Sequence, residues 1–169
     1  MTSLITEEIR AKATELYHGN DECMTQARRL FKEMNFPNGL LPLRDVEECG
    51  YVEETGFVWL KQKQEIEHTF EKIDKHVRYA TEVTAYVEPC KILKLTGVQA
   101  KELLIWVTIN EITVETPESD KVVFKNNFTG LNKIFPKDAF VVEVKEETQV
   151  KEKEEVDAVA AEPVEVKEV

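Results

Sequence analysis

Three cysteines are the candidate nucleophiles of this chain, and their surroundings differ. Cys23 and Cys49 each follow two acidic residues, whose charges disfavour a thiolate. Cys90 precedes Lys91 in a predicted turn, so it is the strongest nucleophile candidate. A structural role is the simpler interpretation of each cysteine, because thiolate activation needs an electropositive site around the sulfur.

The histidines and serines do not complete a catalytic set. His68 beside Glu67 is a candidate acid–base pair, but a structural histidine with one polar partner is the simpler interpretation. The three histidines are too far apart for a helical metal pair, and the cysteines show no C-x-x-C spacing, so we expect no metal site. Ser3 and Ser119 are the only serines. Neither lies in G-x-S-x-G, which excludes the usual nucleophile elbow of a serine hydrolase and leaves the catalytic residues unknown.

The charge balance is acidic, with 22 Lys and Arg against 33 Asp and Glu and a formal net charge of −11. Such a chain neutralises phosphates poorly, so we expect no nucleic-acid partner. The six glycines form neither a P-loop nor a dinucleotide fingerprint, which predicts no nucleotide cofactor. The absence of a signal-peptide core and of an apolar run of about 18 residues predicts a cytoplasmic protein without a transmembrane segment. We also expect a monomer.

A loosely basic stretch lies within this acidic chain and has two interpretations. Lysines on a solvated strand edge hinder edge-to-edge pairing, which explains the stretch most simply. Contact with phosphate or lipid headgroups, and therefore a weak peripheral membrane contact, is the alternative. The stretch comprises Lys61, Lys63, Lys72, Lys75, His76 and Arg78.

Residues 1–38 are predicted to form a helical segment that packs on a sheet. Thr6, followed by two glutamates, can cap a first helix. Gly19 predicts its end, and Asn20 or Asp21 can cap a second helix, although one helix bent at Gly19 is an alternative. The expected apolar faces are Ile9, Ala13 and Leu16 in the first helix, and Cys23 or Met24, Ala27, Leu30 or Phe31, and Met34 in the second.

Residues 39–144 change to an apolar period of two, which predicts an antiparallel, barrel-like sheet. The longest strand candidate is residues 98–115. Within it, residues 103–107 are apolar on both faces, so we expect the sheet interior and the N-terminal helix to cover them. A change of apolar phase near Asn110 predicts a bulge or bend.

Residues 64–76 fit either a helix or a strand, and we favour a strand because strands follow closely on both sides. Short strands are predicted at 121–125 and 139–144. Residues 145–169 hold four Lys, nine acidic residues and no aromatic residue. They are predicted to form a disordered acidic tail, because they cannot bury enough apolar surface to offset their ordering entropy. The fold class is therefore mainly β with N-terminal α-helix, an α+β arrangement.

A series of short motifs covers most of residues 36–143. They are Gly39-Leu40-Leu41-Pro42, Phe57-Val58-Trp59-Leu60, Tyr79-Ala80 with Val83-Thr84, Ile92 to Leu95 with Gly97-Val98, Lys101-Glu102-Leu103, Trp106, and Phe135-Pro136 with Ala139-Phe140. In order and spacing they resemble the plant family filed as domain of unknown function 538. Members of that family often carry Gly at the position of Cys90 and at or near Asp74, where this chain departs from the pattern.

The resemblance implies a plant protein with a largely antiparallel, barrel-like sheet and an N-terminal helix. It also implies a similarity to half of a bactericidal/permeability-increasing lipid-binding protein, or hydrolysis of carboxyl esters such as chlorophyll. The family has no agreed catalytic residues, so the resemblance assigns none here. The serine usage of this chain fits the esterase activity poorly.

Surplus apolar strand surface without catalytic groups favours a non-enzymatic binding module for an apolar or amphiphilic ligand, such as a lipid or pigment. The expected ligand-binding residues are Trp59, Val83, Ile105 and Val107. One alternative is a carboxyl-ester hydrolase that uses Cys90 or the acid–base pair named above. Another is a stress-related scaffold whose acidic tail meets a basic partner.

Overall fold

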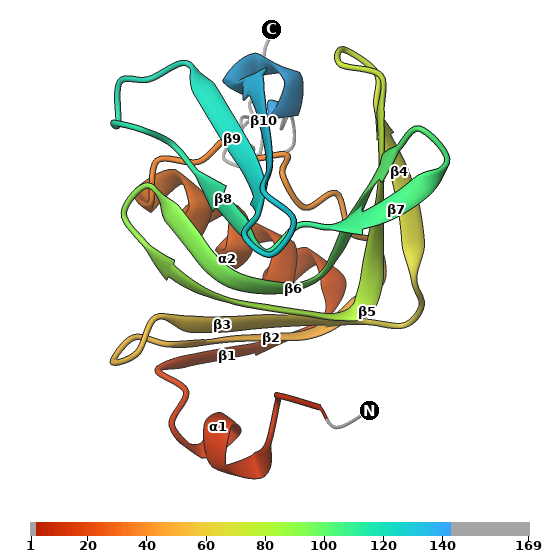
Figure 1. Cartoon of the computed structure of the whole chain (residues 1–169). Coiled ribbons are helices and arrows are strands. Elements are labelled where there is room, and N and C mark those ends of the chain that lie inside the picture. The colour runs from red at the N-terminus through yellow and green to blue at the C-terminus, as the bar shows by residue number, and fades with distance from the viewer. Residues whose placement is uncertain (1–2, 143–169) are drawn as a thin grey trace, which may run out of the picture.

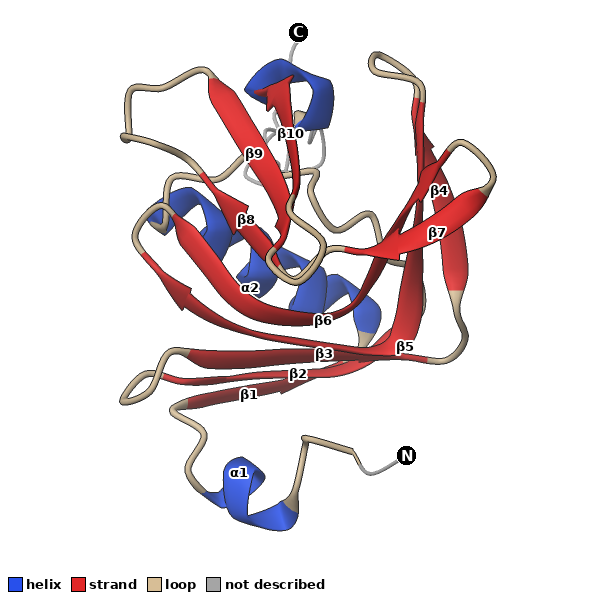
Figure 2. Cartoon of the chain, in the orientation of Figure 1, coloured by secondary structure: helices blue, strands red, loops and turns tan. Residues whose placement is uncertain are grey.

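The structure, a computed structural model, describes residues 3–142, and antiparallel strands dominate them (Figures 1 and 2). The predicted mainly antiparallel β architecture with an N-terminal helix is thereby confirmed. The predicted tail, 145–169, and the end of the predicted 39–144 segment lie outside the described residues. The elements are α1 (Glu7–Ala11), β1 (Glu15–His18), α2 (Asn20–Glu33), β2 (Val46–Val52), β3 (Phe57–Gln62), β4 (Ile66–Phe70), β5 (Lys75–Glu88), β6 (Lys91–Glu102), β7 (Ile105–Thr108), β8 (Glu111–Thr113), β9 (Lys121–Asn126), β10 (Leu131–Pro136) and the 3₁₀ helix η1 (Lys137–Phe140).

The strands form one sheet with the order β1-β2-β3-β5-β6-β8-β9-β10, in which β4 pairs with β5 and β7 pairs with β6. Within residues 3–142 no ladder joins β1 to β10, so the sheet is open and the expected barrel-like sheet is not a closed barrel. Side chains connect the β10 end to the β4–β6 arm instead. Lys133 lies 3.6 Å from Glu102, and the rings of Phe70 and Phe140 lie 4.9 Å apart.

Strand β5 changes partners along its length, and this produces much of the curvature. Its first part pairs with β4 and its last part with β3. At the changeover, the Gln62 amide donates hydrogen bonds to the carbonyls of Tyr79 and Ala80, at 3.2 and 2.9 Å. On the other side of β5, Gly97 has a φ of 84°, and a Cβ there would collide with the Glu82 carbonyl. Only glycine adopts this conformation in the available space.

The two faces of β2 and β3 are buried against different segments. On the inner face, Cys49 and Leu60 belong to the main core with the α2 residues Met24 and Phe31. On the outer face, Ile5, Val52, Phe57 and Trp59 form a second buried cluster, against which Ile9 and Ala13 of the N-terminal segment pack. Figure 1 shows α1 on the side of β1–β3 opposite to α2. The N-terminal segment and α2 therefore hold these strands between them.

The N-terminal region differs from the prediction in the length of its first helix. Thr6 caps α1 as expected, because its hydroxyl accepts a hydrogen bond from the Ile9 amide at 3.1 Å. Yet α1 ends at Ala11, and Leu16 lies in β1, which pairs with β2. Asn20 does not cap α2; its side chain accepts a hydrogen bond from the Val46 amide instead. The helical hydrogen bonds lost by ending α1 at Ala11 are replaced by the backbone hydrogen bonds between β1 and β2.

The single strand expected over residues 98–115 is wrong, and so is the expectation that residues 103–107 are covered on both faces. Strand β6 already begins at Lys91, and the chain reverses at Leu103 and Leu104 to form β7. Leu103, Leu104 and Ile105 are exposed. The expected interruption near Asn110 is present, because Asn110 separates the end of β7 from β8.

Further along the chain, two expectations are confirmed and one is wrong. Residues 64–76 contain the strand β4 rather than a helix, and β9 replaces the predicted strand at 121–125 with nearly the same bounds. Residues 137–140 form η1 rather than the start of a strand. Phe140 is buried there and stacks on Phe124 at 5.3 Å, so its core packing did not require a strand.

Gly50 supplies a test of this packing, because the space of its missing side chain is filled by the six-membered ring of Trp59 on the neighbouring strand. We expect Gly50→Ala to lower the free energy of unfolding by about 3 kcal/mol, the upper range for overpacking. Urea unfolding measures this cost. In a Trp59→Leu background the same substitution should cost clearly less, and an equal cost in both backgrounds would contradict the packing described here.

Candidate functional site

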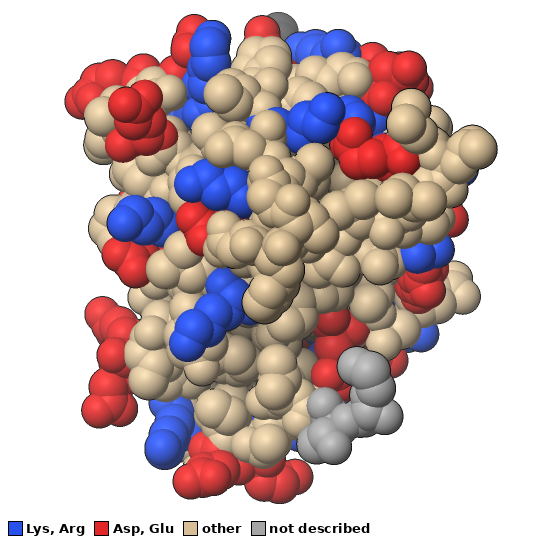
Figure 3. Space-filling model, viewed as in Figure 1, with Lys and Arg blue, Asp and Glu red and all other residues tan. Residues whose placement is uncertain are grey.

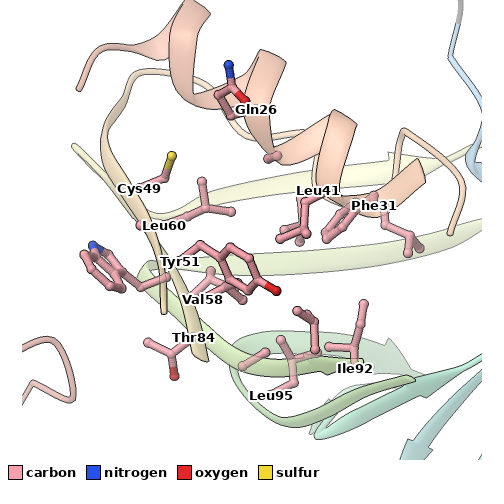
Figure 4. Close-up of a pocket in the computed structure, with 18 of the residues that line it drawn as sticks. Gln26, Phe31, Leu41, Cys49, Tyr51, Val58, Leu60, Thr84, Ile92 and Leu95 are labelled. Atoms are coloured by element: carbon pink, nitrogen blue, oxygen red, sulfur yellow. The ribbon is translucent and has the colours of Figure 1, made fainter. Parts of the chain in front are cut away.

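An apolar cavity lies between α2 and the inner face of the sheet (Figure 4). Its volume is about 70 Å³. Helix α2 forms one wall, and β1, β2, β3, β5, β6, β8 and β9 contribute to the others. The walls include Phe31, Leu41, Tyr51, Val58, Leu60, Ile92 and Leu95.

The rim of the cavity at α2 and β1 is polar. Arg29 of α2 donates to the Glu15 carboxylate of β1 at 2.7 Å and to Glu33 at 2.9 Å. The Tyr17 hydroxyl donates to the same Glu15 carboxylate at 3.0 Å. This ion pair joins α2 to the sheet edge beside the apolar space. Arg29 is exposed, so the pair contributes little to stability.

Tyr51 presents a polar group to an otherwise apolar wall. Its ring lies among Leu60, Val58 and Leu41 in Figure 4, and its hydroxyl makes no hydrogen bond to any residue of the described part of the chain. Burial, followed by the charge of Glu53, raises the pKa of this phenol. Tyr51 therefore remains a neutral donor that a ligand could use. The sequence showed only an isolated aromatic residue here, and the register with Val58 is what places it on the inner face.

The four residues expected to bind ligand do not come together. Trp59 and Val83 border the cavity, whereas Ile105 and Val107 lie on β7, away from it. The indole of Trp59 points to the outer face, where Nε1 donates to the Glu48 carboxylate at 2.8 Å. Ligand binding by all four residues at one site would need a different arrangement of β7. The cavity instead unites residues of α2 with residues of β2, β3 and β6.

Glu48 holds a polar cluster on the outer face. Besides Trp59, it accepts a hydrogen bond from Arg10 at 3.0 Å, and the His18 ring lies 3.7 Å away. Burial acts to raise the pKa of this carboxyl, but the hydrogen bonds from Trp59 and Arg10 outweigh it, so the pKa lies below its ordinary value. The cluster joins the segment around α1 to β2 and β3. These contacts indicate a role in stability.

The cysteines do not form a nucleophilic site. Burial raises the pKa of the thiols of Cys23 and Cys49, which keeps both protonated. Cys90 lies in the β5–β6 turn, where its sulfur accepts a weak hydrogen bond from the Asn35 amide at 3.6 Å. No histidine side chain of the described residues hydrogen-bonds to a cysteine or a serine. Cys90 therefore has no general base beside it.

The pair Glu67 and His68 is separated by strand geometry. The two residues are neighbours in β4, so their side chains point to opposite faces. The His68 ring packs on Phe70 at 4.7 Å, and burial, followed by the charge of Arg44, lowers its pKa. Within residues 3–142, no three His, Cys, Asp or Glu side chains are grouped as a metal site would require. None of the helices in that part has the length and apolar character needed to cross a bilayer.

Comparison with known proteins places the chain in a family. Residues 27–141 match the family described as protein of unknown function, DUF538. The chain belongs to this family. The resemblance seen in the motifs is thereby confirmed, and the DUF538 match contains most of the residues that line the cavity. No curated protein and no solved structure matches the chain.

The backbone of the turn at Cys90 has a conformation that favours glycine. Cys90 has a φ of 67°, in the left-handed region that costs a side-chain-bearing residue roughly 1–2 kcal/mol. We expect Cys90→Gly to raise the free energy of unfolding by about 1 kcal/mol, measured by urea unfolding. Cys90→Ala keeps the backbone strain and is the control; an equal gain from both would assign the effect to loss of the thiol.

Glu48 predicts a pH dependence. Because its pKa is lower in the folded state, its contribution to stability is complete above its unfolded pKa of roughly 4.3 and is lost as the pH falls through the folded value. We expect Glu48→Gln to lower the free energy of unfolding at pH 7 by about 1–2 kcal/mol and to reduce the loss of stability between neutral pH and acid. The exposed Glu47→Gln is the control. Parallel pH profiles of Glu48→Gln and wild type would contradict this role.

Proposed function

We propose that this protein binds an apolar ligand, or the hydrocarbon part of an amphiphile, in the cavity between α2 and the sheet. The observation that carries the proposal is an apolar space within the core that is bordered by a polar rim. Side chains normally fill a domain interior with few voids larger than a water molecule. Apolar walls do not hold water well, so a hydrocarbon group is the occupant that matches them.

The volume limits what the cavity would enclose. Ligand pockets commonly measure about 300–1,000 Å³, and an apolar cavity of about 150 Å³ accommodates benzene. A space of about 70 Å³ therefore fits the end of an alkyl chain or a small branched group. A whole chlorophyll ring system would require α2 to leave the sheet. The proposal consequently favours a lipid chain over a pigment macrocycle.

The polar groups at the rim would orient such an amphiphile. Tyr51 offers a neutral hydroxyl donor, and Arg29 offers a cation that is already shared between Glu15 and Glu33. An anionic head group would compete with these carboxylates for Arg29. A binding role, rather than ester hydrolysis, is supported because the thiol on the cavity wall, Cys49, is held protonated by its burial.

Filling the cavity tests the proposal. Ala85 and Ala27 lie on opposite walls, so Ala85→Leu and Ala27→Leu each add a side chain to the space. The probe is cis-parinaric acid, a fluorescent fatty acid whose emission rises in apolar surroundings. We expect saturable binding to the wild type and binding at least about tenfold weaker in either variant, because the volume needed by the chain is occupied.

The control is Ala80→Leu, the same substitution on β5 at a residue that does not line the cavity. It should bind cis-parinaric acid like the wild type. Thermal unfolding verifies that each variant is folded. Wild-type affinity in both filled variants, or no saturable binding by the wild type, would refute a ligand in this cavity.

A further inference from the structure

The end of the β6–β7 hairpin exposes three consecutive aliphatic side chains, which we name the apolar tip. Leu103 is 94% exposed, Leu104 is 89% exposed and Ile105 is 63% exposed. Strand β7 pairs with β6 alone, so the hairpin extends from the rest of the sheet. Figure 3 shows the hairpin end as an uncharged projection at the upper right. Exposed aliphatic groups gathered in this way indicate an interaction surface.

The backbone of the turn argues against a stabilising role for these leucines. Leu103, the first residue of the two-residue turn, has a φ of 58°, whereas Leu104 does not have a positive φ. A positive φ at the first position alone is the pattern of a type II′ turn, which favours glycine there. A leucine at this position has a strained backbone, and its exposed side chain buries no apolar surface that would offset the strain. Glycine or a polar residue would therefore make the turn more stable, so we attribute the leucines to a role other than folding.

Next to the apolar tip, the hairpin carries a tryptophan with two cations against its ring. The guanidinium of Arg78 lies 4.2 Å from the centre of the Trp106 ring, and the Lys101 ammonium lies 5.8 Å from it. Lys75 and Lys133 flank the same end of the hairpin through their ion pairs with Glu102. Tryptophan and cations at the base of an aliphatic projection match the order of layers in a bilayer, from headgroups to hydrocarbon.

We infer that the β6–β7 hairpin docks on a bilayer that contains anionic lipids. The apolar tip enters the hydrocarbon, Trp106 lies at the headgroup level, and Lys101 and Arg78 meet lipid phosphates. A convex tip of three aliphatic residues needs a partner that deforms around it. Beside it Lys75, Arg78, Lys101 and Lys133 outnumber the carboxylates that pair with them, Glu65 and Glu102, and this excess of positive charge favours an anionic surface. The chain has a net charge of −11. Salt screens charges beyond roughly 8 Å at physiological ionic strength, so the groups beside the hairpin decide the contact.

This inference is independent of the proposed cavity ligand, and binding to vesicles tests it. The full chain is mixed with vesicles of phosphatidylcholine and phosphatidylserine at about three to one, and with vesicles of phosphatidylcholine alone. Sedimentation should show binding to the mixed vesicles and clearly weaker binding to the neutral ones. Leu103→Gly with Leu104→Ser should weaken binding on the order of a hundredfold, because both inserted side chains are lost.

Stability and a matched control separate docking from misfolding and from general stickiness. The double variant should unfold at the wild-type temperature or above it, since glycine suits the turn, and it should still bind cis-parinaric acid like the wild type. Phe128→Ser is the control, because Phe128 is 91% exposed on another hairpin. This variant should sediment with vesicles like the wild type. Wild-type binding by the double variant, or an equal loss in Phe128→Ser, would overturn the inference.

Tryptophan fluorescence gives a second readout. Trp59 is 1% exposed and Trp106 is half-buried, so only Trp106 should report on contact with lipid. Mixed vesicles should shift the wild-type emission to shorter wavelength, and Trp106→Phe should remove that shift. Lys101→Gln should weaken binding to the mixed vesicles several-fold without changing binding to neutral ones. A shift that persists in Trp106→Phe would place the contact elsewhere and overturn the inference.

Discussion

The burial of both faces of β2 and β3 is the constraint on which the rest of the structure depends. A strand pair covered on one side alone would leave either the main core or the outer cluster around Trp59 in water. Trp59 fills the space above Gly50 and donates to Glu48, so one side chain joins apolar packing to the polar cluster that holds Arg10. The N-terminal segment is thereby fixed to the sheet from outside. Helix α2 is free to pack on the inner face.

The cavity is a consequence of how α2 meets a curved sheet. A straight helix contacts a concave surface most closely where the strands rise toward it, and the strands between those contacts leave space. Here the curvature arises where β5 changes its partner from β4 to β3, at Gln62 and Gly97. Residues that do not themselves line the cavity therefore influence its shape. The open sheet has the same origin, since its β10 end meets the β4–β6 arm through side chains such as Lys133 and Phe140 rather than through a ladder.

The sequence predicted what depends on local periodicity. Alternation identified β3 and β5, and Thr6 marked the first cap. The apolar stripe expected on α2 left open Cys23 or Met24 and Leu30 or Phe31; Cys23, Met24 and Phe31 are buried. It did not predict β1, because a four-residue strand after a short helix resembles a continued helical face and depends on pairing with β2. Sequence periodicity could not predict the cavity either. The cavity depends on the relative positions of Phe31, Tyr51 and Ile92, and only the tertiary packing defines these.

The failure at residues 103–107 has a separate cause. An apolar run looks the same in sequence whether it lies in the core or on an exposed contact surface. Burial was therefore predicted for Leu103, Leu104 and Ile105. The structure places them at the end of a hairpin, where they are exposed to water and the turn strains Leu103. Local preference and global fold usually agree in a protein, and disagreement concentrates where function imposes a cost on folding. Exposed aliphatic side chains are unfavourable in water, and a leucine is unfavourable at the first position of this turn. Contact with an apolar environment outside the protein, such as a bilayer, explains both features.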